Sequence, residues 1–274
     1  MPVHSGQALQ RLVPAQKERS LKDKVIIVSG AGRGLGLVQS EALLEAGAKV
    51  YAIDRLEKPD PDFARVQARA EELGTSLTFQ RLDVRDNISL NATVQKIADD
   101  NGRIDGLLAC AGIQQETSAL EYTMEDADKM FGVNITGVFM TAQAVARQMR
   151  RLDRPGSMVL IASMSGHVAN KGLICPAYNA SKAGVLQLGR NLAAEWGLHG
   201  IRVNTISPGY IVTAMTAPLF KQYPDRKENW PKQNMLGRLS YPEEYRGAAV
   251  FLLSDASSFM TGSDLRMDGG HCAW

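Results

Sequence analysis

A glycine-rich turn between a strand and a helix constrains the fold of this chain more than any other stretch. The apolar run 24–29 predicts a buried strand, and the pattern from Leu37 onward predicts a helix. Between them, Gly30, Gly34 and Gly36 follow the spacing Gly-x-x-x-Gly-x-Gly. Glycines let the backbone turn tightly and approach a pyrophosphate, whose negative charge the helix N-terminus stabilises. The stretch therefore predicts a dinucleotide-binding βαβ unit, with a purely structural turn as the alternative.

An acidic residue ends the next predicted strand, 48–54. Asp54 lies about twenty residues after the glycines, where an acid hydrogen-bonds the adenosine ribose of NAD and repels the 2′-phosphate of NADP. Arg33 and Arg55 oppose this reading, because either could bind a 2′-phosphate. We therefore predict NAD, with NADP as the alternative. A further alternative is that Asp54 only caps the loop that follows it.

Strand-like and helix-like patterns alternate along the rest of the chain. Short apolar runs predict buried strands, and longer segments with apolar residues every three or four positions predict helices. Further strands are predicted over 76–82, 104–110, 157–163, 201–206 and 264–267, about seven in all, and helices over 88–99, 125–150, 178–198 and 241–253. This alternation predicts an α/β fold, a Rossmann-type doubly wound parallel sheet with helices on both faces.

The chain is expected to fold as one domain. No internal repeat and no linker rich in proline, glycine or serine divides it, so residues 23–274 should form a single dinucleotide-binding catalytic domain after an N-terminal arm, residues 1–22. Residues 210–240 break the alternation with three prolines and mixed charge, and they are too many for an ordinary connection. We predict that they form a substrate lid, with a surface insertion as the alternative.

Composition excludes several classes of function. Of 274 residues, 45% are hydrophobic, and a formal net charge of +2 gives no electrostatic footprint for nucleic acid. No apolar run is long enough for a transmembrane helix or a secretory signal, so no membrane partner is expected. Cys110, Cys175 and Cys272 lack metal-ligand spacing, which predicts reduced thiols in a cytoplasmic protein and no metal site.

A tyrosine and a lysine at helical spacing are the candidate chemical groups. Tyr178 and Lys182 lie one turn apart at the start of a predicted helix. A cation that close lowers the pKa of a phenol from about 10, so that it exchanges protons nearer neutral pH. Ser163 and Ser165 follow a predicted strand, at the end where ligands bind in open α/β sheets. The pattern predicts a general acid/base, although a Tyr-x-x-x-Lys pair also arises by chance.

The motifs of the chain, in their order, resemble those of the short-chain dehydrogenase/reductase family. The likeness covers residues 24–270, with one departure at 109–112, where the chain has Ala-Cys-Ala-Gly and the family has Asn-Asn-Ala-Gly. The resemblance implies a nicotinamide dinucleotide bound by Gly30, Arg33, Gly34, Leu35, Gly36, Asp54, Arg55, Asp83, Val84, Ala111, Gly112, Tyr178, Lys182, Pro208, Gly209, Ile211 and Thr213.

The resemblance also implies a catalytic tetrad of Asn134, Ser165, Tyr178 and Lys182. Ser165, thirteen residues before Tyr178, corresponds to the serine that hydrogen-bonds the substrate oxygen while the tyrosine gives or takes its proton. Lys182 then holds the nicotinamide ribose and lowers the pKa of the phenol, and Asn134 positions water for a proton relay. The implied reaction interconverts a secondary alcohol and a ketone by hydride transfer.

The end of the chain suggests a substrate class. The segment 268–274, Asp-Gly-Gly-His-Cys-Ala-Trp, looks like the tails of family members that act on polyols and sugars. We therefore predict an NAD(P)-dependent polyol dehydrogenase or sugar ketoreductase, with a small-molecule alcohol or ketone as substrate. A 3-oxoacyl thioester reductase is the alternative enzyme. A dinucleotide-binding sensor without turnover is the alternative from another class, and the complete tetrad argues against it.

Assembly into a homotetramer is also expected. The predicted helices 125–150 and 178–198 carry apolar residues on more than one face, in one Val138, Met140, Val145 and Met149 and in the other Val185, Leu188 and Leu192. A second apolar face favours a partner, and the resemblance implies that these helices pair across two-fold axes in a tetramer. The terminal Trp274 is large and apolar, so we expect it near another subunit's substrate site.

Overall fold

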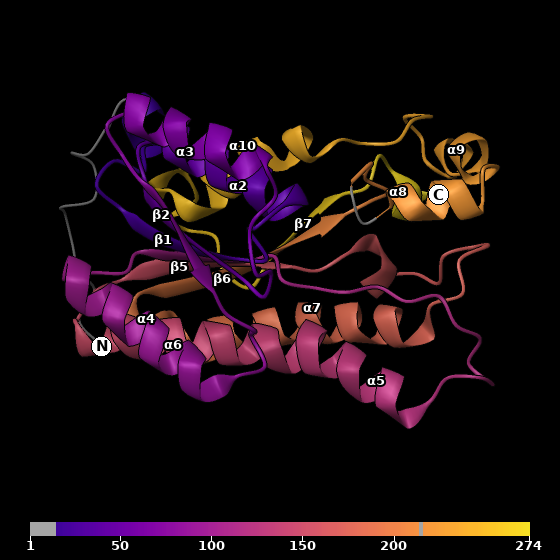
Figure 1. The fold of residues 1–274 in the computed structure, drawn as a ribbon, viewed down its shortest axis with the longest axis horizontal. Coiled ribbons are helices and arrows are strands. Elements are labelled where there is room, and N and C mark those ends of the chain that lie inside the picture. Colours follow the sequence, from indigo (N-terminus) through magenta and orange to yellow (C-terminus); the bar gives the residue numbers. More distant parts are fainter. Residues whose placement is uncertain (1–14, 214–215) are drawn as a thin grey trace, which may run out of the picture.

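The computed structural model describes residues 15–213 and 216–274, and its centre is a seven-stranded parallel sheet (Figure 1). The strand order β3-β2-β1-β4-β5-β6-β7 reverses direction between β1 and β4, the kind of position where doubly wound folds bind ligands. The predicted fold class is confirmed. The strands are β1 (Val25–Ser29), β2 (Lys49–Asp54), β3 (Leu77–Arg81), β4 (Gly106–Ala109), β5 (Gly156–Ile161), β6 (Ile201–Pro208) and β7 (Asp264–Met267).

Helices cover both faces of the sheet (Figure 1). Alternate residues of each strand face the two layers: Val25 and Ile27 pack with one set of helices, and Ile26 and Val28 pack with the other. The first set is α4 (Asn87–Asn101), α6 (Val138–Arg151) and α7 (Pro176–Trp196), and the second is α2 (Gly34–Glu45), α3 (Asp62–Glu72) and α10 (Arg246–Leu253). Among the described residues, no helix is long and apolar enough to cross a membrane.

Local signals set several helix ends. The side chain of Asp86 accepts a hydrogen bond from the backbone N–H of Ser89 and so caps α4, which ends at Gly102 in the left-handed conformation, φ +64°. Thr123 caps α5 (Met124–Phe131) in the same way, through the N–H of Asp126. These are the side chains and backbone conformations that helix ends favour, so the helix boundaries follow from local chemistry.

The elements differ from the predicted ones in three places. The helix expected over 125–150 is α5, a π-helical segment at Gly132–Gly137 and then α6. The helix expected over 241–253 starts as a 3-10 turn, Pro242–Tyr245, before α10. The helix α3 (Asp62–Glu72) was not among the predicted elements, although its buried residues Phe63, Val66 and Ala70 have helical spacing.

The predicted N-terminal arm is partly integrated into the domain. Residues 1–14 lie outside the described residues, and a short helix, α1 (Ala15–Glu18), follows them. Leu21 is fully buried in the core, and its N–H donates to the carbonyl of Ala46 at 2.8 Å. The folded domain therefore begins before residue 23.

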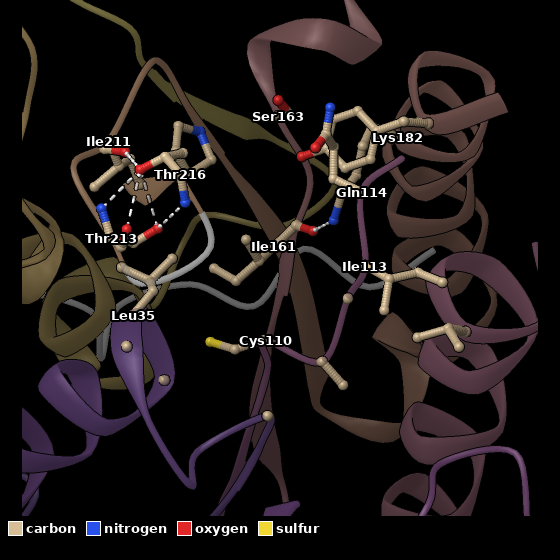
Figure 2. A pocket seen from close by; sticks show the side chains of 18 of the residues that line it. Leu35, Cys110, Ile113, Gln114, Ile161, Ser163, Lys182, Ile211, Thr213 and Thr216 are labelled. Carbon is tan, nitrogen blue, oxygen red and sulfur yellow. Dashed lines mark hydrogen bonds between the residues drawn. The ribbon is translucent and has the colours of Figure 1, made fainter. Parts of the chain in front are cut away.

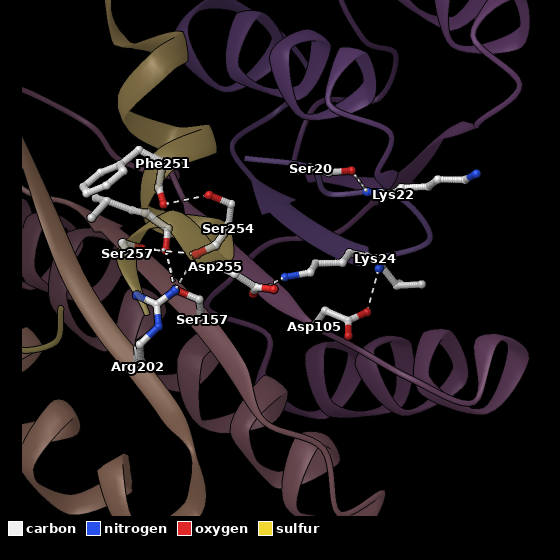
Figure 3. A network of polar contacts seen from close by, with 12 residues as sticks. Ser20, Lys22, Lys24, Asp105, Ser157, Arg202, Phe251, Ser254, Asp255 and Ser257 are labelled. Atoms are coloured by element: carbon white, nitrogen blue, oxygen red, sulfur yellow. Dashed lines mark hydrogen bonds and ion pairs between the residues drawn. The ribbon is translucent and has the colours of Figure 1, made fainter. Parts of the chain in front are cut away.

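Side-chain contacts occupy the side of the sheet where the strands begin. Arg202, near the start of β6, donates through Nη2 to the carbonyls of Leu252 and Ser254, each at 3.0 Å (Figure 3). These carbonyls end α10 and have no partner within the helix. Nζ of Lys24 binds Asp255 at 2.9 Å on the same side. Because contacts that hold helix ends occupy this side, the opposite side, where the strands end, is the one open to a ligand.

Candidate active site

A cavity of about 410 Å³ lies at the end of the sheet where the strands end, between the glycine turn and the described part of residues 210–240, the predicted lid. It is the place where the strand ends of a parallel sheet converge. Of the predicted cofactor-binding and catalytic residues, Asn134 alone is outside its lining. The predicted residues that line it are Gly30, Arg33, Gly34, Leu35, Gly36, Asp54, Arg55, Asp83, Val84, Ala111, Gly112, Ser165, Tyr178, Lys182, Pro208, Gly209, Ile211 and Thr213.

The glycine turn has the geometry that a dinucleotide requires. Gly30 has φ +67°, and a Cβ there would lie 2.7 Å from the backbone of Ala111, so a side chain does not fit. Gly34 has φ +58° and faces open space, with no atom within 4 Å of such a Cβ. Arg33, at the N-cap of α2, makes no side-chain cap bond. A pyrophosphate fits against these backbone N–H groups at the start of α2.

Two acids of the predicted cofactor site accept hydrogen bonds from the protein. Asp54 accepts from the N–H of Gly32 at 2.9 Å and from that of Leu56 at 3.1 Å. Its carboxylate therefore orders the loop after β2, the capping role that the sequence left open. Asp83 is paired with Arg85, whose Nη2 lies 2.7 Å from Oδ2, and this hydrogen bond lowers the pKa of Asp83.

Tyr178 lies in the first turn of α7, which Pro176 starts. Burial of the phenol raises the pKa of Tyr178 to about 12, and a hydrogen bond with Ser163 acts in the opposite direction. One turn later, Nζ of Lys182 donates to the carbonyl of Ile161 at 2.8 Å and lies 5.7 Å from the centre of the Tyr178 ring (Figure 2). Burial lowers the pKa of Lys182 to about 8. The pKa of the phenol is thus raised above its ordinary value of about 10, where the sequence predicted a lowered one, because burial is the largest effect on Tyr178.

Ser163 is the serine whose hydroxyl acts on the phenol of Tyr178 and lowers its pKa. Its backbone is extended, φ −173°, directly after β5, and its Oγ accepts from the N–H of Ser165 at 3.1 Å. Ser165 lies one step further, in the 3-10 turn Met164–Gly166. The sequence predicted Ser165 for this position, whereas the structure brings Ser163 to the phenol. Both serines line the cavity, so the catalytic role of Ser165 stays a prediction.

Asn134 lies beneath the cavity in the π-helical segment and is fully buried. Its Oδ1 accepts from the N–H of Ile113, and its Nδ2 donates to the carbonyl of Ile113, both at 2.9 Å. Nδ2 also donates to Oγ of Ser181 at 3.0 Å, and Ser181 in turn donates to the carbonyl of Tyr178. The side chain therefore joins the segment after β4 to the first turn of α7.

Five further residues line the cavity that the sequence patterns did not assign to a site. Gln114 and Leu173 come from the segments after β4 and β5, and Tyr210, Leu219 and Trp230 come from the lid. Scattered aromatics among residues 210–240 were the available signal, but they carry no spacing that assigns them to a cavity. Within 15–213 and 216–274, no group of three or more His, Cys, Asp or Glu is arranged to hold a metal ion.

Comparison with known proteins shows the family of this chain. A family model described as Enoyl-(Acyl carrier protein) reductase matches residues 30–271. The short chain dehydrogenases/reductase notP' of Aspergillus versicolor is 43% identical over 260 residues, which cover 93% of this chain and 89% of that protein. The ribulose-forming D-arabinitol 2-dehydrogenase of Candida albicans (strain WO-1) is 34% identical over 265 residues, 93% of this chain and 94% of that protein.

A solved structure has the same fold over the same length. The gluconate 5-dehydrogenase from Burkholderia cenocepacia J2315, in complex with NADP and tartrate, is 31% identical, with a TM-score of 0.86. The match covers 95% of this chain and 99% of that one. Since the family model and both relatives span nearly the whole chain, the protein belongs to the short-chain dehydrogenase/reductase family of oxidoreductases.

Proposed function

We propose that this protein is an NAD-dependent oxidoreductase that interconverts a secondary alcohol and a ketone on a polyol or sugar. The observation that carries the proposal is that Ser163 and Tyr178 lie together in the wall of a cavity that the glycine turn also lines. The similarity to a D-arabinitol dehydrogenase and a gluconate dehydrogenase supports a hydroxylated substrate. The same pair argues against a sensor without turnover.

Different residues of the cavity would bind different parts of a dinucleotide. Gly30, Gly34 and Gly36 would receive the pyrophosphate, Asp54 the adenosine ribose, and residues 208–213 the nicotinamide. When bound, the nicotinamide gives or accepts the hydride. The protein then has to orient the substrate and move one proton.

Tyr178 is the residue that transfers this proton to or from the substrate oxygen. Its raised pKa, about 12, keeps the phenol protonated at neutral pH, ready to give the proton to a ketone oxygen. Ser163, whose hydroxyl acts on the phenol, would hydrogen-bond the same substrate oxygen. With a pKa of about 8, Lys182 is largely an ammonium at pH 7, and this charge favours the phenolate when an alcohol is oxidised. Asn134 holds Tyr178 in place through Ser181.

A parallel assay tests the proposal. Polyols, ketoses and 3-oxoacyl thioesters are each offered with NAD(H) and NADP(H), and kcat/KM is measured for each pair. We expect the highest kcat/KM for a polyol or ketose with NAD(H). A 3-oxoacyl thioester reductase, the alternative enzyme, would instead prefer the acyl thioester. No turnover of any polyol or ketose would refute the proposed substrate class.

Cofactor choice depends on a balance between Asp54 and two arginines. Arg33 and Arg55 are exposed at the cavity and could bind a 2′-phosphate, which the carboxylate of Asp54 repels. Asp54→Ala is expected to shift the ratio of kcat/KM for NADP to that for NAD by about 10-fold or more toward NADP. Asp54→Asn, which removes the charge and keeps one of the two acceptor oxygens that bind Gly32 and Leu56, should shift it in the same direction with less loss of stability than alanine. A wild-type preference for NADPH would contradict the assignment.

We further propose that the protein is a homotetramer. Most of the apolar residues that suggested a second face on α6 and α7 are buried in the chain's own core, so that reason is weaker than the sequence implied. Met140 and Leu188 are partly exposed, and Trp274 is 81% exposed, which supports a partner. Deletion of residues 272–274 is expected to weaken assembly or substrate binding more than cofactor binding. Analytical ultracentrifugation of both proteins checks this, and a monomer at micromolar concentration would refute it.

A further inference from the structure

The lid contributes a packed aromatic wall to the cavity. Tyr210 and Trp230 both line it, and their rings are stacked, 4.1 Å between centroids and 10° between planes. Phe220 packs edge-on against Trp230 at 5.4 Å. Trp230 is only 3% exposed. Because these rings support one another, the position of Trp230 decides how much room a substrate has.

A buried ion pair lies one turn before this tryptophan. Arg226, at the start of α9 (Arg226–Asn229), donates from Nη1 and Nη2 to the two carboxylate oxygens of Glu116, at 2.5 and 2.6 Å. The exposed fractions are 9% for the Arg226 side chain and 14% for Glu116. The guanidinium lies 3.9 Å from the centre of the Tyr223 ring, which covers it. Two parallel charge-assisted bonds fix both the distance and the direction of the pair.

The ion pair joins two walls of the cavity. Glu116 follows Gln114 by two residues in the segment after β4, and Gln114 lines the cavity. On the lid, the N–H of Trp230 donates to the carbonyl of Arg226 at 3.0 Å, so arginine and tryptophan move together. The pair spans 110 residues of sequence. Loss of either partner leaves the other as a buried, unpaired charge.

We propose that Arg226 is a positioning residue, whose ion pair with Glu116 holds Trp230 in the cavity wall and thereby limits the size of the substrate. The inference rests on the proposed function, since it concerns the substrate of that site. A compact hydroxylated ketone such as an open-chain ketose is accommodated beside the fixed ring. A substrate with a bulky ring requires Trp230 to move.

Kinetics of two variants test the proposal. Arg226→Met and Glu116→Gln are each expected to raise the KM of the best polyol or ketose about 10-fold, with kcat within about threefold of wild type. The Kd of the dinucleotide should change less than about twofold, because the ion pair lies outside the residues assigned to the cofactor. The double variant should resemble either single variant, since each one already breaks the pair. Arg226→Lys keeps the positive charge but cannot form the two parallel hydrogen bonds to Glu116, so it should give an intermediate KM.

The preference between two substrates is a readout that a general loss of structure would not change. In Arg226→Met, kcat/KM for a phenyl-substituted ketone relative to the ketose should rise about fivefold or more. Lys232→Met is the matched control, because it breaks an ion pair with Glu228 on the same lid whose side chains are 63% and 77% exposed. The control should behave as wild type. The proposal is overturned if both ion-pair variants match the control, or if both substrates and the cofactor lose affinity by the same factor.

Amide hydrogen exchange in residues 217–233 of the lid tests whether the ion pair holds the lid in place. This measurement needs no substrate. Exchange in Arg226→Met and Glu116→Gln is expected to be about fivefold or more faster than in wild type and in Lys232→Met. Unchanged exchange in both variants would overturn the proposal. If wild type turned over no polyol or ketose, the proposed function would fail, and the exchange experiment would still decide the role of Arg226.

Discussion

Replacement of Tyr178 by phenylalanine is expected to lower kcat about 10³-fold or more, while the Kd of the dinucleotide changes less than about threefold. The variant lacks the hydroxyl that bonds to Ser163, so no proton reaches the substrate oxygen from this position. The glycine turn, which we assign to the pyrophosphate, keeps its geometry. Steady-state rates followed through nicotinamide absorbance and a fluorescence titration of cofactor binding separate the two effects.

A second tyrosine offers a matched control for this substitution. The hydroxyl of Tyr122 is buried without a hydrogen-bond partner, and the residue is outside the lining of the cavity. Tyr122→Phe removes the same atom and should leave kcat unchanged. If Tyr178→Phe kept a tenth or more of the wild-type kcat, the assignment of the general acid/base would be wrong.

Ser163→Ala is expected to lower kcat about 10²-fold, and Ser165→Ala no more than about threefold. The reason is that Ser163 bonds to the phenol, whereas Ser165 contributes its backbone N–H to Ser163, a bond that alanine preserves. Ser163→Thr retains a hydroxyl and should recover part of the activity. Measurements of kcat at saturating substrate compare the three variants under identical conditions.

The reverse order of effects would return the catalytic role to Ser165. The comparison is informative because both serines line the same cavity and both are almost fully buried. A loss of folding would affect both variants alike and would appear as a lowered melting temperature. Equal activities in two folded variants would mean that neither hydroxyl contacts the substrate oxygen.

The sheet was predictable because each strand is specified locally. Ile26 to Val28 form an apolar run whose alternate residues enter two different cores, so the run is visible without knowledge of its partners. The glycine turn is equally visible in the sequence, since the positive φ angles of Gly30 and Gly34 favour glycine at both positions. Residues at strand ends, such as Asp54 and Gly112, then reach the cavity because parallel strands end at one edge.

The rest of the site depends on contacts that no short pattern encodes. The choice between Ser163 and Ser165 is set by the path of a loop, and the pairing of Glu116 with Arg226 by the position of the lid. The pKa of Tyr178 was misjudged for a related reason. Spacing places Lys182 nearby, but only the folded structure shows how strongly burial acts on the phenol.

The order of strands in the sheet also has a consequence for biosynthesis. β1 pairs with β2 and β4, so roughly fifty residues, or about 3 to 10 s of translation, separate the arrival of its two neighbours. Until β4 emerges, one edge of β1 is unpaired, although all five of its residues are buried in the finished protein. The part of the cavity that we propose for the nicotinamide forms later. Gly209 there donates its N–H to the carbonyl of Met267 on β7, which is the last strand to be synthesised. A ribosome-bound chain therefore exposes its most apolar strand early and completes its binding site only at the end of synthesis.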